Sequence, residues 1–166
     1  VFFNSDTSPI FERPAVIGGT AYFPSFAGLV YPVDMSGSVA KVGEPWNLVP
    51  EAERAKKWAP AGLGLVDKDD QGRLYVIMHP DAADGTQQRG GPEVWVYDPL
   101  AQKRVQRIAL KSWGLSLALS RGENPVLMVV NPNDMSLEMY DAGSGEFIRT
   151  ITGFGQATPL LVHGSN

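Results

Sequence analysis

The sequence has 166 residues, of which 43% are hydrophobic and 19% charged, and these proportions suit a soluble globular domain with its own core. The net charge of −4 and the lack of a basic stripe argue against nucleic-acid binding, and no stretch approaches the roughly 18 apolar residues of a membrane-spanning helix. The absence of cysteine excludes disulfides and thiolate metal sites within this stretch. Because the sequence starts Val1-Phe2-Phe3, without Met or a signal peptide, we expect a piece of a longer chain.

Four short apolar segments open the sequence. We expect strands over 15–18, 20–23, 29–34 and 39–42, and the third of these ends at Asp34. The 18 Gly and 13 Pro favour many short elements separated by turns. Short connections between successive strands predict a four-stranded antiparallel meander.

An insertion over 43–61 follows this first unit. Pro50 suits a first helical position, acidic residues follow it and basic residues close the segment, so we expect a short helix over 50–58. Trp46 and Trp58 flank this helix. Aromatic side chains beside exposed loops anchor partners at many interfaces, so both are candidate contact residues for a partner. The alternative is that they pin the insertion to the adjacent sheet.

A second unit has strands expected over 63–66, 73–80, 93–99 and 104–110, with a long loop over 80–92. Its first turn begins like a calcium-binding loop at Asp67, but Met78 stands where such a loop needs Glu, so we interpret the segment as a turn. His79 and His163 are far apart and have no thiolate neighbours, so no metal-ligand cluster is expected.

A third unit has strands expected over 116–119, 125–132, 136–142 and 146–151, and 159–162 would begin a fourth. The third strands end at Asp34, Asp98 and Asp141, and each Asp precedes a tight turn whose backbone its carboxylate can bind. Asp98 and Asp141 lie 43 residues apart, which suits a four-stranded propeller blade. The pattern therefore predicts an all-β fold, a β-propeller of which residues 1–166 form about three and a half blades of one domain. A sandwich is the competing fold.

Strand parity predicts where the long connections lie. In a meander, the connections between second and third strands share a face with those between blades. The insertion 43–61 and the loop 80–92 are therefore expected on one face, which is the candidate partner face. No nucleophile elbow or complete dinucleotide fingerprint occurs, so no catalytic, cofactor-binding or metal-binding residue is assigned in this chain.

Four segments carry a family resemblance: Glu51-Ala-Glu-Arg-Ala55, Trp58 two residues before Pro60, the Leu74-Tyr-Val-Ile run, and Asp141-Ala-Gly-Ser-Gly-Glu146. Over about 11–161 the sequence resembles the second half of the heavy subunit of quinoprotein amine dehydrogenases. Aromatic amine dehydrogenases look closest, with methylamine dehydrogenases the near alternative.

The resemblance implies a seven-bladed propeller in a periplasmic α2β2 enzyme that oxidises primary amines to aldehyde and ammonia. We expect these amines to be aromatic. It places the tryptophan tryptophylquinone cofactor in the small subunit and implies azurin or amicyanin as the electron acceptor. This chain would then be a scaffold without a catalytic centre. The alternative is a non-catalytic propeller of the YVTN or WD type that serves as a protein-interaction module.

Overall fold

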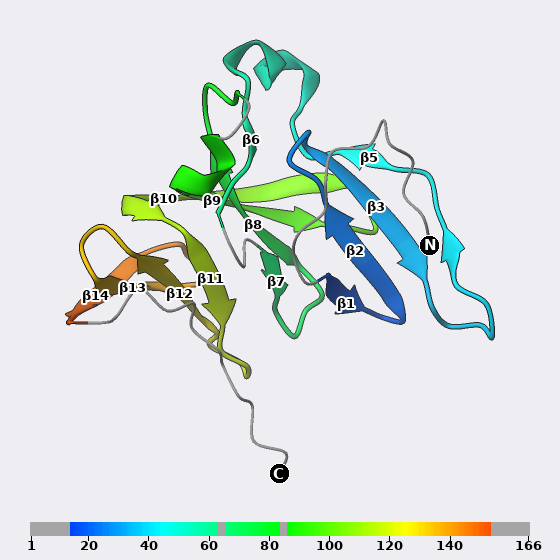
Figure 1. Cartoon of the computed structure of the whole chain (residues 1–166). Helices are drawn as coiled ribbons and strands as arrows, with labels where there is room; N and C mark the ends of the chain where they lie inside the picture. Colours follow the sequence, from blue (N-terminus) through cyan, green and yellow to red (C-terminus); the bar gives the residue numbers. More distant parts are fainter. Residues whose placement is uncertain (1–13, 63–65, 84–85, 154–166) are drawn as a thin grey trace.

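The computed structural model describes residues 14–62, 66–83 and 86–153, and they form three antiparallel sheets in chain order (Figure 1). The first sheet contains β1 (Ala15–Ile17), β2 (Thr20–Pro24), β3 (Leu29–Asp34), β4 (Lys41–Val42) and β5 (Trp46–Asn47). The second contains β6 (Ala59–Pro60), β7 (Val66–Lys68), β8 (Leu74–His79), β9 (Gly91–Asp98) and β10 (Lys103–Gly114). The third contains β11 (Ser116–Leu119), β12 (Val126–Asn131), β13 (Ser136–Asp141) and β14 (Phe147–Thr152). Two 3-10 helices, η1 (Glu51–Lys56) and η2 (Thr86–Arg89), lie in the connections.

The three sheets are arranged as successive propeller blades, which confirms the predicted fold class. The innermost strand of the middle blade, β7, contacts the innermost strands β1 and β11 of its neighbours. Hydrogen bonds join the blades here: Asp67 Oδ2 on β7 accepts from Leu119 N on β11 at 2.9 Å, and Tyr75 OH donates to Ala142 O at 3.2 Å. The middle blade is thus bonded to the third blade from two of its strands, β7 and β8.

Asp34, Asp98 and Asp141 occupy equivalent positions, as the repeat predicts. Each is the last residue of the third strand of its blade. Each carboxylate accepts a backbone N–H from the following turn, at 2.7 to 3.0 Å. Their shared role is therefore to fix the turn into the outer strand.

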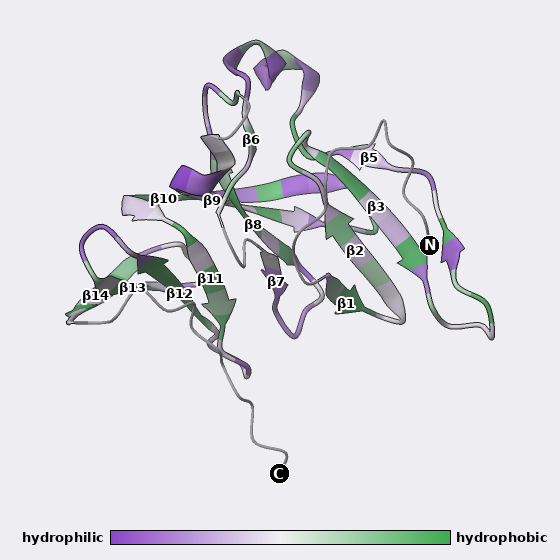
Figure 2. Ribbon diagram, viewed as in Figure 1, coloured by the Kyte–Doolittle hydropathy of each residue, from purple (hydrophilic) through white to green (hydrophobic). Residues whose placement is uncertain are grey.

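The core is centred on the middle blade. All six residues of β8 are buried, because this strand has sheet neighbours on both edges and a blade on each face. Figure 2 shows the contrast with η1, which is mainly hydrophilic. No helix within the described residues is long and apolar enough to cross a bilayer.

One predicted strand differs in the structure, and another lies mostly outside the described residues. The outer strand expected over 39–42 is shorter in the structure, where it is β4. The end of β3 pairs with β4, and the start of β3 pairs with β5. Of the inner strand expected over 63–66, residues 63–65 lie outside the described residues and Val66 is the first residue of β7; β6 and β7 both pair with β8. Gly62 lies between β6 and β7 with φ +103°, and a Cβ there would stand 2.1 Å from Leu115 O, so this position requires glycine.

The expected helix within 50–58 is present as η1, a 3-10 helix rather than an α-helix. Pro50 precedes it and Lys57, at φ 48°, ends it in the left-handed conformation. Because β5 and β6 belong to the sheets, the insertion predicted at 43–61 leaves the blades only between them. The expected strand at 159–162 and His163 lie outside the described residues.

Candidate partner interface

The two long connections lie on the same face, as strand parity predicts. Asp81 N donates to Lys56 O at 3.1 Å, and Ala82 N donates to Lys57 O at 2.8 Å. The end of η1 is thus joined by backbone hydrogen bonds to the loop that follows β8, at one end of the sheets (Figure 1). We call this end the elaborated face.

Four charged side chains hold η1 on the middle blade, and we name them the insertion clamp: Glu53, Glu93, Arg104 and Arg107. Arg104 donates to both carboxylate oxygens of Glu53, at 2.5 and 3.1 Å. Arg107 lies 3.5 Å from Glu53 and donates to Glu93 at 2.7 and 2.8 Å. The hydrogen bond from Arg104 holds the pKa of Glu53 below its ordinary value. The clamp therefore keeps η1 fixed by charge-assisted hydrogen bonds.

Aromatic rings lie beneath the clamp. Trp58 packs on Trp95 with 5.0 Å between ring centroids, and Arg104 stacks 4.3 Å above Trp95. Arg107 lies 5.3 Å from the ring of Trp58, which is half-buried. Trp58 therefore pins the insertion to the blade within this chain, and its contact with a partner stays a prediction.

Trp46 lies on the other side of η1, in β5. It is 7% exposed and packs on Tyr97 with 5.7 Å between centroids. The hydroxyl of Tyr97 donates to Leu48 O at 2.9 Å, so the start of the insertion is also fixed to the middle blade. Among the described residues, neither Trp46 Nε1 nor Trp58 Nε1 has a hydrogen-bond partner. A partner contact of Trp46 likewise stays a prediction.

One feature of the elaborated face was not predicted from the sequence. A hollow of about 430 Å³ lies between η2, the β10–β11 connection and the β12–β13 turn, and Trp113, 40% exposed, is part of its wall. Trp113 is the last residue but one of β10, in which exposed and more buried residues alternate, so nothing in its sequence context marks it as a surface feature. The remaining residues around the hollow are Gln88, Arg89, Leu115, Pro132 and Asn133.

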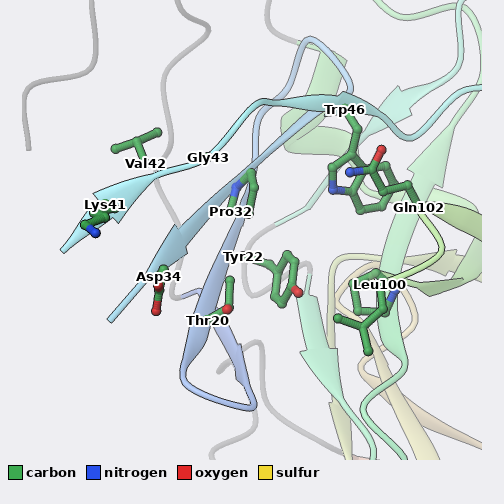
Figure 3. Close-up of a pocket in the computed structure, with 11 residues that line it drawn as sticks. Thr20, Tyr22, Pro32, Asp34, Lys41, Val42, Gly43, Trp46, Leu100 and Gln102 are labelled. Carbon is green, nitrogen blue, oxygen red and sulfur yellow. The ribbon is translucent and has the colours of Figure 1, made fainter. Parts of the chain in front are cut away.

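A second depression, which we call the crevice, lies between the first blade and the β9–β10 turn (Figure 3). Its volume is about 340 Å³. Tyr22 and Trp46 contribute aromatic rings, Pro32 and Leu100 apolar surface, and Asp34 a carboxylate. Residues of both the first and the middle blade line the crevice, and these blades correspond to separate repeats of the sequence.

The calcium-like segment is a structural turn, as predicted. Asp69 is 2% exposed and accepts from Gln71 N, Arg73 N, Arg73 Nε and Tyr75 OH, at distances of 2.5 to 3.1 Å. Its carboxylate is therefore occupied by the protein's own donors. No group of three or more His, Cys, Asp or Glu that could hold a metal occurs among the described residues.

Comparison with known proteins identifies the family. The family model "Methylamine dehydrogenase heavy chain (MADH)" matches residues 1–164. The chain belongs to this heavy-chain family. The resemblance to the quinoprotein amine dehydrogenase heavy subunit is thereby confirmed at the level of the family.

Curated relatives agree with this assignment. The chain is 24% identical over 163 residues to the methylamine dehydrogenase heavy chain of Paracoccus versutus, which covers 96% of this chain and 38% of that protein. It is 23% identical over 166 residues to that of Methylorubrum extorquens, covering 99% and 40%. The chain thus spans about 40% of the length of these heavy chains.

A solved structure titled Kuenenia stuttgartiensis Hydrazine Synthase is similar in fold, with a TM-score of 0.62 at 17% identity, over 93% of this chain and 39% of that one. In this member of the methylamine dehydrogenase heavy-chain family, the described residues form propeller blades, and η1, the loop after β8 and the insertion clamp lie at one end of them.

Proposed function

We propose that this chain is part of the scaffold subunit of a tryptophan tryptophylquinone amine dehydrogenase, which oxidises primary amines to aldehyde and ammonia. The match of the heavy-chain family model along residues 1–164 carries this proposal. The quinone belongs to a small partner subunit, two heavy and two small chains assemble as α2β2, and electrons pass to azurin or amicyanin. The location proposed for the assembly is the periplasm.

The tryptophans of this chain do not fit a quinone of their own. Such a cofactor needs two joined indoles that an amine can reach. Trp58 and Trp95 pack together, but Trp95 is 0% exposed, its Nε1 donates to Glu93 at 2.6 Å, and Arg104 covers its face. The proposal therefore assigns the quinone to the partner subunit, and we derive no chemical step from this chain.

The proposed substrate is either an aromatic amine or methylamine. The sequence resemblance favours an aromatic amine, whereas the curated relatives are named for methylamine. Initial rates with phenethylamine and methylamine on the purified heterotetramer separate the two: a higher kcat/KM for phenethylamine supports the aromatic case.

We propose that the small subunit binds the elaborated face. This face carries both long connections, and η1 is held there by the insertion clamp, so it offers fixed rather than mobile contact groups. Trp46 and Trp58 are the contact residues proposed from the sequence, and Trp113 adds an exposed ring on the same face. A structure of the complex tests the assignment. Contacts confined to the face of the turns containing Gly37, Ala101 and Gly143 would contradict it.

The central experiment compares the full-length heavy chain alone with the chain co-expressed with its small subunit. We expect amine-dependent dye reduction and visible quinone absorbance only from the co-expressed assembly. Dye reduction by the isolated heavy chain would refute the scaffold role. Purification of the assembly without any visible-absorbing quinone would favour the alternative, a propeller that serves only protein interaction.

A further inference from the structure

The hollow beside Trp113 lies at the junction of the middle and third blades. η2 and the end of β10 come from the middle blade, and the β12–β13 turn comes from the third. Both blades belong to the described residues, so the hollow is a feature between two blades rather than the free end of the row of sheets. Its volume of about 430 Å³ lies within the range of pockets that enclose a ligand or a few side chains.

Trp113 gives this hollow a large apolar wall. The side chain is 40% exposed, and Leu115 and Pro132, both half-buried, line the hollow with it. A tryptophan ring buries a large apolar area on binding and loses little side-chain entropy, because it has only two rotatable bonds. An exposed tryptophan beside a concavity is therefore a strong anchor for a partner.

The walls of the hollow are fixed within the chain. Gly90 follows η2 and lies so close to the end of β10 that a Cβ there would stand 2.1 Å from Gly114 O. In the connection to β11, Leu115 N donates to Val130 O of the third blade at 2.8 Å. A partner that enters the hollow therefore meets a preformed site, and little free energy is lost in ordering it.

The charge in the wall of the hollow is positive. Arg89 is the charged residue of the wall, its side chain is exposed, and no ion pair joins it to another described residue. The nearby Asp134 accepts from Asn131 Nδ2 at 2.8 Å, so its carboxylate is bound within its own turn. The Arg89 guanidinium is thus available to a carboxylate from outside the described residues.

The adjoining part of the elaborated face is also positive. Lys56 and Lys57, at the end of η1, are both exposed and outnumber the neighbouring Asp81. The acidic residues of the insertion clamp, Glu53 and Glu93, are already paired with arginines of the same chain. Since the whole chain carries a net charge of −4, this end has the opposite sign to the chain as a whole. Such a surface is complementary to an acidic partner segment.

From these features we infer that the hollow receives a loop of the small subunit that carries an Asp or Glu. The carboxylate accepts two parallel hydrogen bonds from the Arg89 guanidinium, and an apolar residue beside it in the loop packs on Trp113. This inference rests on the proposed function, because it takes the small subunit as the occupant.

The other partners of the proposed assembly fit the hollow less well. A second heavy chain meeting this face across a two-fold axis would bring the same cations toward Arg89. An electron acceptor has to leave after each transfer and therefore suits a small, weak contact. A preformed pocket with an aromatic anchor suits a subunit that stays bound.

The first test measures the dissociation constant between the full-length heavy chain and its small subunit, by mass photometry of the diluted assembly. We expect Trp113→Ala to raise it about thirtyfold, the factor for truncation of a dominant interface residue. Arg89→Ala should raise it about tenfold, and Arg89→Lys less, because an ammonium group keeps the charge but not the two parallel hydrogen bonds. Lys103→Ala, exposed at the other end of β10, is the control and should leave it unchanged.

The second test locates the occupant directly by photo-crosslinking. With p-benzoylphenylalanine in place of Trp113, illumination of the assembly should join this position to a small-subunit peptide that contains Asp or Glu. The same amino acid in place of Leu100, which is 85% exposed in the β9–β10 turn, is the control and should not reach the small subunit.

The outcomes separate this inference from the proposed function. Parent-like dissociation constants for both Trp113→Ala and Arg89→Ala would overturn the inference and leave the scaffold role intact. Cross-links from position 113 only to another heavy chain, or to a small-subunit peptide without an acidic residue, would do the same. If the parent chain takes up no small subunit, the proposed function and the inference both fail.

Discussion

Glu53 and Arg104 form a two-point ion pair, with N–O distances of 2.5 and 3.1 Å, although they lie 51 residues apart in the chain. Glu53 lies on η1 and Arg104 on β10, so this one pair joins the insertion to the outer strand of the middle blade. The side chains are 23% and 18% exposed, which reduces solvent screening relative to a surface pair. The position of the elaborated face therefore depends on a contact between distant parts of the sequence.

Replacing Glu53 should loosen η1 without unfolding the blades. We expect Glu53→Gln to lower the free energy of unfolding by about 1 kcal/mol, since the pair is only partly buried. Hydrogen exchange provides the local measurement: the amides of Asp81 and Ala82, which donate to η1 and its cap, should exchange faster. Glu51→Gln, on the exposed side of the same helix, is the control and should change neither value. Unchanged exchange at both amides in Glu53→Gln would show that the clamp does not position η1.

Removing the Asp69 carboxylate should destabilise the middle blade strongly. Its side chain is 1% exposed and accepts from Arg73 N, Arg73 Nε and Tyr75 OH, so Asp69→Ala removes these hydrogen bonds and leaves the Arg73 guanidinium without its ion-pair partner. We expect a loss of about 3 kcal/mol in denaturant unfolding. Asp70→Ala, in the same turn but 52% exposed, is the matched control and should cost below about 1 kcal/mol. Equal losses for the two variants would mean that burial of Asp69 is not what matters.

Acidification should destabilise the fold through His79. This side chain is 2% exposed, and burial lowers its pKa despite the opposing influence of Asp81. Below the ordinary histidine pKa of about 6.5, the unfolded chain therefore binds a proton that the folded chain resists, and stability falls as the pH falls. Denaturant unfolding measured between pH 7.5 and 5 should show this slope, and His79→Gln should reduce it. A slope that is the same in both proteins would place the titrating group elsewhere.

Gly91 should tolerate no side chain. A Cβ there would stand 2.1 Å from Met78 O, a backbone atom of the neighbouring strand that cannot move aside by rotation. We expect Gly91→Ala to cost about 3 kcal/mol by overpacking, measured as a lower thermal midpoint. Gly37→Ala, whose Cβ would lie 3.8 Å from its nearest neighbour, Val39 O, should fold as the parent does. Parent-like stability of Gly91→Ala would mean that the approach of Met78 O does not restrict the side chain at position 91.

The sequence by itself determined the blade pattern. Alternating apolar runs, tight turns and the repeated Tyr-Asp ending are local features, and the equivalence of Asp34, Asp98 and Asp141 follows from them. The shared face of the two long connections also followed, because strand parity depends only on the number of reversals of the chain. The match to a heavy-chain family agrees with this part of the prediction.

Only the tertiary structure decided how the blades meet and where the strands break. Leu115 O, on the adjacent connection, lies 2.1 Å from where a Cβ at position 62 would stand, and no local pattern records that only glycine fits there. The clamp between Glu53 and Arg104 and the crevice between Tyr22 and Leu100 likewise join residues dozens of positions apart. Periodicity reports which side of a strand is buried, but the partner across a blade interface depends on packing in three dimensions, and that information is not local in the chain.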